Sequence, residues 1–69
     1  MSKYLIRFKT QDGENVYIEL VLFSAESLMD ASKYAEREAK ESTDFMRECK
    51  VASVKEISES DYDVLIKYL

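Results

Sequence analysis

The stretch NVYIELVLF, residues 15–23, decides the fold because it has the pattern of a β-strand with two apolar faces. Successive side chains of a strand point to opposite sides. One face therefore carries four aliphatic side chains, those of Val16, Ile18, Leu20 and Leu22. The other carries Tyr17, Glu19, Val21 and Phe23. The first face is typical of a core strand. The second, outer face is too apolar to meet only water, so we expect it to be covered.

The segment KYLIRFKT, residues 3–10, alternates in the same way, and the turn signal QDG separates it from the first stretch. Directly opposed residues on antiparallel strands share a face. A two-residue turn would set Phe8 opposite Tyr17 and mix the two faces. A three-residue loop made of QDG sets Phe8 opposite Val16 and keeps the faces apart, as a five-residue loop also would. We predict the three-residue loop, with Gly13 at positive φ.

Residues 25 to about 41 have the periodicity of a helix, and Ser24 is placed to cap its first turn. One side of this helix consists mainly of small residues, which allow close packing on a sheet: Leu28, Ala31, Ser32, Ala35 and Ala39. The opposite side is charged, as a solvated helix face is. We expect the small-residue side to pack on the sheet face formed by Tyr4, Ile6, Phe8, Val16, Ile18, Leu20 and Leu22.

The remainder of the chain has weaker signals. Residues 42–49 have no clear period and are predicted to form a connection in which Phe45 and Met46 fold back as a plug. Residues 50–57 are strand-like, but their apolar positions do not alternate strictly, so either a bulge switches faces or the strand is short. Ser60 is placed to cap a short C-terminal helix with a single apolar stripe, formed by Tyr62, Leu65, Ile66 and Leu69.

These elements predict one α+β domain over residues 1–69, with the order β-β-α-β-α. The predicted architecture is a two-layer sandwich. An antiparallel hairpin and a third strand form the sheet, one long helix packs on it, and a short helix ends the chain.

The composition argues against an enzyme and against bound metals or cofactors. The chain has no histidine, one cysteine (Cys49) and one glycine, whereas general-base catalysis, zinc sites and phosphate loops depend on these residues. The net charge of −4 argues against direct binding to a nucleic-acid backbone.

A lone thiol suits a reducing compartment, and no segment is apolar enough for a signal or a membrane span, so we expect a cytoplasmic protein.

Two surfaces are candidate binding sites. The first is the outer face of the sheet, formed by Leu5, Arg7, Tyr17, Glu19, Val21 and Phe23. Either the C-terminal helix covers this face or another chain does, and we expect another chain, which is a protein target or a second copy in a homodimer. The second candidate is an acidic patch that is either solvated charge or a mimic of a phosphate backbone, formed by Glu56, Glu59, Asp61 and Asp63.

The chain resembles small bacteriophage-encoded proteins. The resemblance lies in the strand KYLIRFKT, the helix SAESLMDASKYAEREAKE (residues 24–41) and the strand VASVKEI (residues 51–57), and it covers about residues 3–57. Some proteins of that group are anti-CRISPR proteins or other inhibitors of host and anti-phage proteins. The resemblance implies a non-catalytic binder of a larger protein in the host bacterium, and it carries over no functional residue.

We therefore expect an acidic protein–protein interaction module that inhibits a host or defence protein. The alternative is an oligomeric protein that binds a small ligand or nucleotide. Its site would use Arg7, Lys9, Tyr17 and Phe23, because aromatic stacking with flanking cations suits bases and phosphates.

Overall fold

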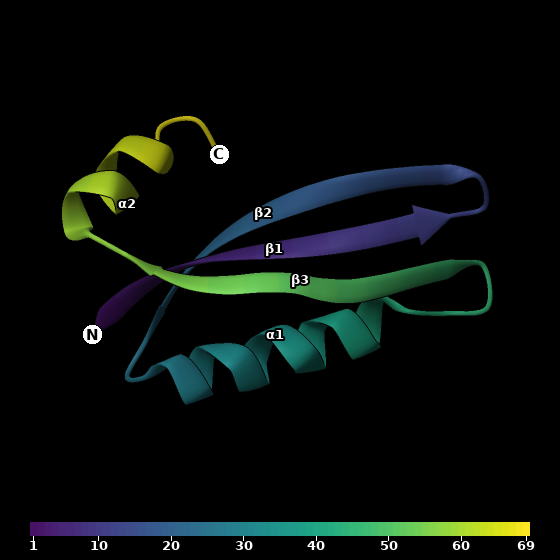
Figure 1. Cartoon of the computed structure of the whole chain (residues 1–69), viewed down its shortest axis with the longest axis horizontal. Coiled ribbons are helices and arrows are strands. Elements are labelled where there is room, and N and C mark those ends of the chain that lie inside the picture. The colour runs from purple at the N-terminus through teal and green to yellow at the C-terminus, as the bar shows by residue number, and fades with distance from the viewer.

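Three strands and two helices follow one another in the order β-β-α-β-α (Figure 1). The computed structural model describes all 69 residues. The strands are β1 (Ser2–Asp12), β2 (Asn15–Ala25) and β3 (Arg47–Ile57), and the helices are α1 (Leu28–Ser42) and α2 (Glu59–Leu65). The predicted small α+β fold is confirmed.

The strands form one antiparallel sheet in the order β2-β1-β3. The central strand β1 is the best buried, because it has a strand on each side and α1 against one face. Its residues Tyr4, Ile6, Phe8 and Thr10 are all buried. Helix α1 runs along the sheet beside β3, whereas α2 follows the end of β3 and contacts the sheet mainly at β1 (Figure 1). Strands β2 and β3 are the two edges of the sheet.

The hairpin between β1 and β2 has a different register from the predicted one. Tyr4 pairs with Phe23, and Phe8 pairs with Glu19 rather than Val16. Because Asp12 pairs with Asn15, only Gly13 and Glu14 form the loop, and the predicted three-residue loop is wrong. Gly13 has a φ of 61°, as predicted, and no other residue has positive φ. This combination fits a type II′ turn, in which glycine takes the first of the two central positions.

The new register exchanges the two faces of β2. The predicted partner of Phe8 and the observed one are three residues apart, and an odd shift turns every side chain to the other side of the sheet. The residues that share a face with Tyr4, Ile6 and Phe8 are Tyr17, Glu19, Val21 and Phe23. The residues on the side away from α1, predicted to be core, are Val16, Ile18, Leu20 and Leu22. Both rows are apolar, so the hydrophobic pattern did not decide between them.

Helix α1 packs on the sheet through its alanines, as predicted. Ala31, Ala35 and Ala39 are buried, and the last two contact Ile6 and Phe8 in the core. The helix begins later than expected, because β2 continues to Ala25. Its N-cap is Ser27, whose hydroxyl accepts a hydrogen bond from the Asp30 N–H (3.2 Å). The predicted cap, Ser24, instead accepts a hydrogen bond from Lys3 Nζ (2.9 Å).

Strand β3 contains the bulge that its sequence suggested. Arg7 pairs with Ser53 and Phe8 with Val51, which leaves Ala52 without a partner on β1. The bulge lets both Val51 and Val54 pack against the core although they are three residues apart.

The two ends of β3 differ from their predicted form. The strand begins at Arg47, and the connection before it is therefore short. Phe45 does not fold back as a plug, because its side chain is 96% exposed. After β3, helix α2 is capped by Ser58 rather than Ser60, through a hydrogen bond from the Asp61 N–H to its hydroxyl (3.1 Å). Neither α1 nor α2 has the length and apolar character needed to cross a membrane.

Candidate binding surface

The side of the sheet away from α1, called here the open face, carries an exposed apolar row. The row comes from β2, and its side chains are largely solvent-accessible: Val16 is 53% exposed, Ile18 54% and Leu20 40%. Next to it on β1, Arg7 pairs with Leu20 and Lys9 with Ile18. Exposed aliphatic side chains in a continuous row are uncommon on proteins that meet only water, and they indicate a contact surface.

The open face is also basic, although the chain is acidic as a whole. Five of the ten basic residues lie on it according to the strand pairing, namely Lys3, Arg7, Lys9, Lys50 and Lys55. Among the strand residues, Glu48 is the one acidic residue on this face. Its Oε1 atom forms an ion pair with Lys50 Nζ (3.0 Å). The acidic residues lie elsewhere, so the net charge of −4 hides a locally positive surface.

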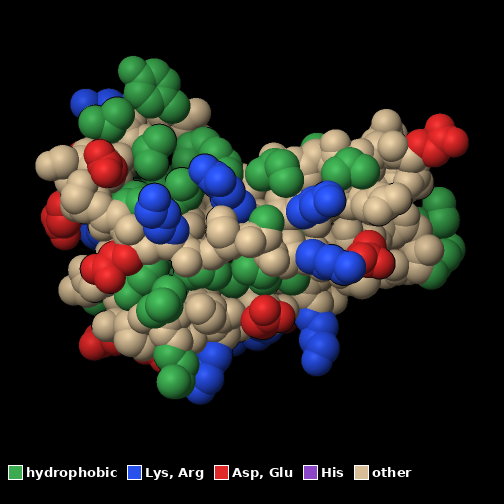
Figure 2. Space-filling model, viewed as in Figure 1, with side chains coloured by type: hydrophobic (Ala, Val, Ile, Leu, Met, Phe, Trp, Pro, Cys, Tyr) green, Lys and Arg blue, Asp and Glu red, His purple; other side chains and the backbone are tan.

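Helix α2 covers only one end of the open face. Lys3 Nζ lies 4.6 Å from the centroid of the Tyr62 ring, which places α2 over the start of β1. Towards the hairpin the face stays open, and a shallow depression there is lined by Arg7, Ile18, Leu20, Ala52 and Ser53. Figure 2 shows this side of the molecule, with hydrophobic and basic side chains around a hollow between α2 and the hairpin end.

The six residues predicted to form the outer face do not form one surface. Leu5 and Arg7 lie on the open face, whereas Tyr17, Glu19, Val21 and Phe23 lie on the side of α1. Phe23 stacks on Tyr34 of α1, with ring centroids 3.9 Å apart and planes 8° from parallel. The alternative nucleotide site fails for the same reason, because Arg7 and Lys9 lie on the opposite side of the sheet from Tyr17 and Phe23.

Sequence reasoning missed the β2 side of the open face and its flanking lysines on β3. The signal that points to them is Gly13 itself, since glycine in the first position of a two-residue turn predicts a type II′ hairpin and with it the observed register.

The acidic patch does not come together as one site. Glu56 lies on β3, on the same side as Tyr4, and Glu59, Asp61 and Asp63 follow in α2, where all are exposed. No three acidic, cysteine or histidine side chains are grouped closely enough to hold a metal ion. Glu59 and Asp61 lie in the first turn of α2, where negative charge is favoured by the helix dipole.

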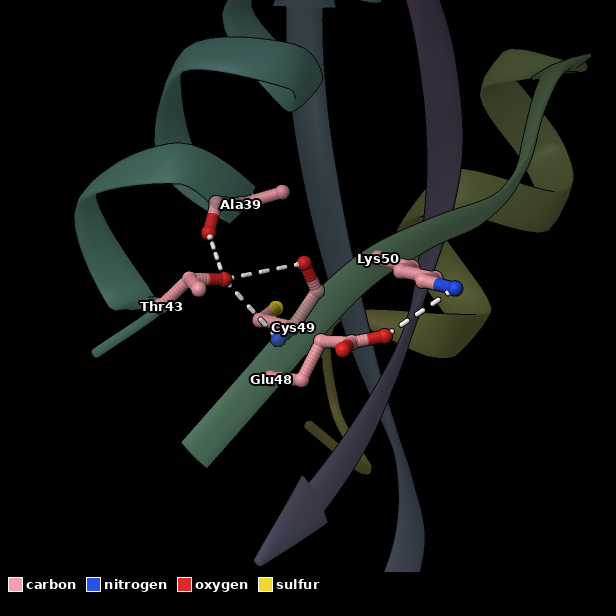
Figure 3. A network of polar contacts seen from close by, with 5 residues as sticks. All are labelled: Ala39, Thr43, Glu48, Cys49 and Lys50. Carbon is pink, nitrogen blue, oxygen red and sulfur yellow. Dashed lines mark hydrogen bonds and ion pairs between the residues drawn. The ribbon is translucent and has the colours of Figure 1, made fainter. Parts of the chain in front are cut away.

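The edge formed by β3 is closed at its first residues, Arg47 to Cys49, by the chain that precedes it. The Thr43 hydroxyl accepts a hydrogen bond from the Cys49 N–H (3.0 Å) and lies 2.9 and 3.2 Å from the carbonyl oxygens of Ala39 and Cys49 (Figure 3). The Asp44 carboxylate accepts from the Arg47 N–H (2.9 Å), and the Asp44 N–H donates to the Arg47 carbonyl (2.8 Å). The outward main-chain groups of β3 at Arg47 and Cys49 are therefore already bonded.

The edge formed by β2 has no such partners. Every second residue of an antiparallel edge strand directs its N–H and C=O away from the sheet. No hydrogen bond from a side chain, a turn or a loop reaches the main chain of residues 15–25. The main chain of β2 is therefore free to pair with another strand.

Comparisons with known proteins give no match: no family model fits the chain, and no curated protein or solved structure is significantly similar to it.

Proposed function

We propose that this chain is a non-catalytic module that binds a protein partner through the open face of its sheet. The observation that carries the proposal is the exposed row of Val16, Ile18 and Leu20 beside Arg7 and Lys9. Burying apolar surface stabilises a complex by about 25 cal/mol per Å². Flanking cations add orientation and faster association when the partner carries the opposite charge. The partner that fits is therefore an acidic protein segment with an apolar side.

The proposed partner is a protein rather than a nucleic acid because of the row on β2. Proteins that bind single strands stack bases on aromatic side chains. The strands contribute no aromatic residue to the open face, since Tyr17 and Phe23 lie on the side of α1. The open face carries the aliphatic side chains of Val16, Ile18 and Leu20 instead, and these suit contact with the apolar side of a peptide or helix.

The experiment compares two charge reversals with the same chemistry on different sides of the molecule. Lys9→Glu changes the open face, and Lys40→Glu changes α1. Each variant and the wild type are immobilised, and the proteins retained from a bacterial lysate are quantified by mass spectrometry. We expect one protein to be retained by the wild type and by Lys40→Glu but lost with Lys9→Glu. A retained protein that is lost with neither variant, or no retained protein, contradicts the proposal.

A second candidate is a ligand that carries phosphate, and the five cations of the open face favour it. Phosphate binding releases counterions and weakens steeply as salt is added, whereas apolar contact does not. Fluorescence anisotropy with a labelled single-stranded oligonucleotide, at low and at high salt, separates the two candidates. Binding that is lost at high salt, and lost with Lys9→Glu, favours the phosphate ligand.

We further propose that the partner is a larger host or defence protein and that binding inhibits it. This narrower role rests on the resemblance of residues 3–57 to small phage-encoded proteins. The test is expression of the chain in bacteria that carry an active CRISPR system, followed by infection with a targeted phage. We expect more plaques with the wild type than with Lys9→Glu. Equal plaque numbers with the wild type and with an empty vector contradict an inhibitor of this system.

A further inference from the structure

We propose that two copies of this chain pair through their β2 strands and form one six-stranded antiparallel sheet with a two-fold axis at Val21. This assembly does not depend on the partner proposed for the open face. The occupant of the free edge is a second copy because β2 matches itself in its main chain and its apolar rows, and because its one charge, Glu19, has a complement in Arg37 of α1.

Apart from the single charge of Glu19, β2 lacks the features that keep edge strands apart. Natural edges are protected by lysine, proline, bulges or covering loops. Among residues 15–25 there is no basic residue and no proline, and the pairing with β1 runs without a bulge. The strand is also long, with 11 residues. A strand of this kind pairs readily with another strand.

The side chains of β2 add apolar surface on both sides of this edge. All residues from Asn15 to Leu20 are exposed, including Tyr17 on the side of α1 and Ile18 on the open face. A second β2 strand would contact both rows at once. Pairing would therefore bury apolar surface above and below the new ladder as well as bond the free main chain.

Glu19 selects the register, because it is the only charged residue in β2. A two-fold axis at Glu19 would set the two carboxylates directly opposite each other, which is destabilising. A two-fold axis at Leu20 would still leave the two Glu19 carboxylates close together, as diagonal neighbours across the ladder. An axis at Val21 sets Glu19 opposite Phe23 of the second copy, with Val21 opposite its own equivalent and Leu20 opposite Leu22.

The surroundings of Phe23 complement Glu19. Phe23 stacks on Tyr34, and the Arg37 guanidinium carbon lies 5.9 Å from the centroid of the Tyr34 ring. Lys33 and Arg37 line the same cavity as Phe23. The only ion pair within the chain joins Lys50 and Glu48, so neither Glu19 nor Arg37 has an ionic partner of its own.

Two acidic residues, Glu26 and Asp30, also line this cavity. Glu26 follows Ala25, the last residue that the Val21 register pairs, and Asp30 precedes Tyr34 by one helical turn. Arg37 is the cation that we expect to meet Glu19 of the second copy, because its guanidinium reaches the Tyr34 ring that stacks on Phe23. The two-fold axis makes this contact twice in each dimer.

The assembly changes the open face as well. Leu20 and Leu22 of the two copies would lie next to each other in the middle of the six-stranded sheet. The basic residues of β1 and β3 would then flank one continuous apolar strip on both sides.

The test is sedimentation velocity of the purified chain over a concentration series, with a charge exchange at the predicted contact. We expect the wild type to dimerise, and Glu19→Arg or Arg37→Glu alone to raise the dissociation constant about tenfold or more. The double variant with both changes should recover the affinity, because each charge meets its opposite again. Glu36→Arg, on a different side of α1, should leave it unchanged. Circular dichroism checks that each variant is folded, which is expected because all three positions are exposed.

A monomer at every concentration overturns the proposal. It is also overturned if the single variants dimerise like the wild type, or if the double variant does not recover what the single variants lose. These outcomes leave the binding role of the open face untouched, because that role is measured with Lys9→Glu and a different partner.

Discussion

The two edge strands of the sheet, β3 and β2, differ in how their outward main-chain groups are protected from pairing with another strand. At the start of β3 the outward groups of Cys49 and Arg47 are bonded by Thr43 and Asp44, a bulge interrupts the ladder at Ala52, and the strand itself contains Lys50 and Lys55. At β2 the main chain has no partner outside β1, and no basic residue or bulge protects it. Edge protection is a property of sequence and local structure, and its absence along β2 is the observation on which the proposed pairing of two copies rests.

The largest effect is expected where α1 supports the protected half of the sheet. Ala35 is fully buried against Ile6 and Phe8, and a larger side chain would force the helix away. We expect Ala35→Leu to lower the free energy of unfolding by about 1–3 kcal/mol. The measurement is urea denaturation, with Glu36→Leu as the exposed control. Equal stability of Ala35→Leu and the wild type would mean that α1 does not pack closely here.

The next effect is expected at the turn that determines which face of β2 is open. Gly13 has a φ of 61°, and no atom lies within 4 Å of an added Cβ. The cost of Gly13→Val is therefore conformational, about 1–2 kcal/mol in the free energy of unfolding. A synthetic chain with D-alanine at this position should keep its stability, because D-residues favour positive φ. If valine and D-alanine destabilise the chain equally, the turn is not of this type.

A smaller effect is expected when the protected edge is opened. Thr43→Val removes the hydroxyl that bonds Cys49, with almost no change in shape. We expect a loss of about 1 kcal/mol in the free energy of unfolding and faster hydrogen exchange of the Cys49 amide, measured by NMR. Thr43→Ser keeps the hydroxyl and should behave like the wild type. A Cys49 amide that exchanges at the same rate in all three chains would mean that Thr43 does not protect this edge.

The smallest effect on stability, but a large one on association, is expected when the free edge is protected. Ile18 is half-exposed on β2, so Ile18→Lys should change the unfolding free energy of the monomer by no more than about 0.5 kcal/mol. It should abolish self-association in sedimentation experiments, because lysine on an edge strand opposes pairing. Ser53→Lys adds the same charge on β3 and should leave association intact. Loss of association in both variants would indicate a general charge effect.

The order of elements was predictable from the sequence because each element has its own period. The alanines at positions 31, 35 and 39 predicted the buried side of α1. The irregular spacing of Val51 and Val54 left a bulge or a short strand as alternatives for β3, and the structure has the bulge. The helix caps were misplaced because several serines lie within a few residues of each start. Ser24 and Ser27 both fit the pattern before α1, and only the end of β2 decides between them.

The register of β2 was not predictable from hydrophobicity, for a reason connected with its proposed role. A strand with one apolar face has one acceptable register, whereas β2 has two apolar faces and accepts either. The turn then decides, and it leaves Val16, Ile18 and Leu20 exposed. The β1 half of the candidate surface, Leu5 and Arg7, was predicted on the correct side, but the β2 half was inverted. A strand with two apolar faces suits the proposed position between β1 of its own chain and β2 of a second copy.

The most direct test of the account is the hydrogen exchange of individual β2 amides, measured by NMR at low and at high protein concentration. If two copies pair through β2, every second amide between Tyr17 and Ala25 exchanges rapidly in dilute solution and becomes protected at high concentration. The amides of β3 should not change, because that edge is not the one that pairs. If the outward amides of β2 exchange rapidly at all concentrations, or if protection appears along β3 instead, the free edge of β2 is not the site of association.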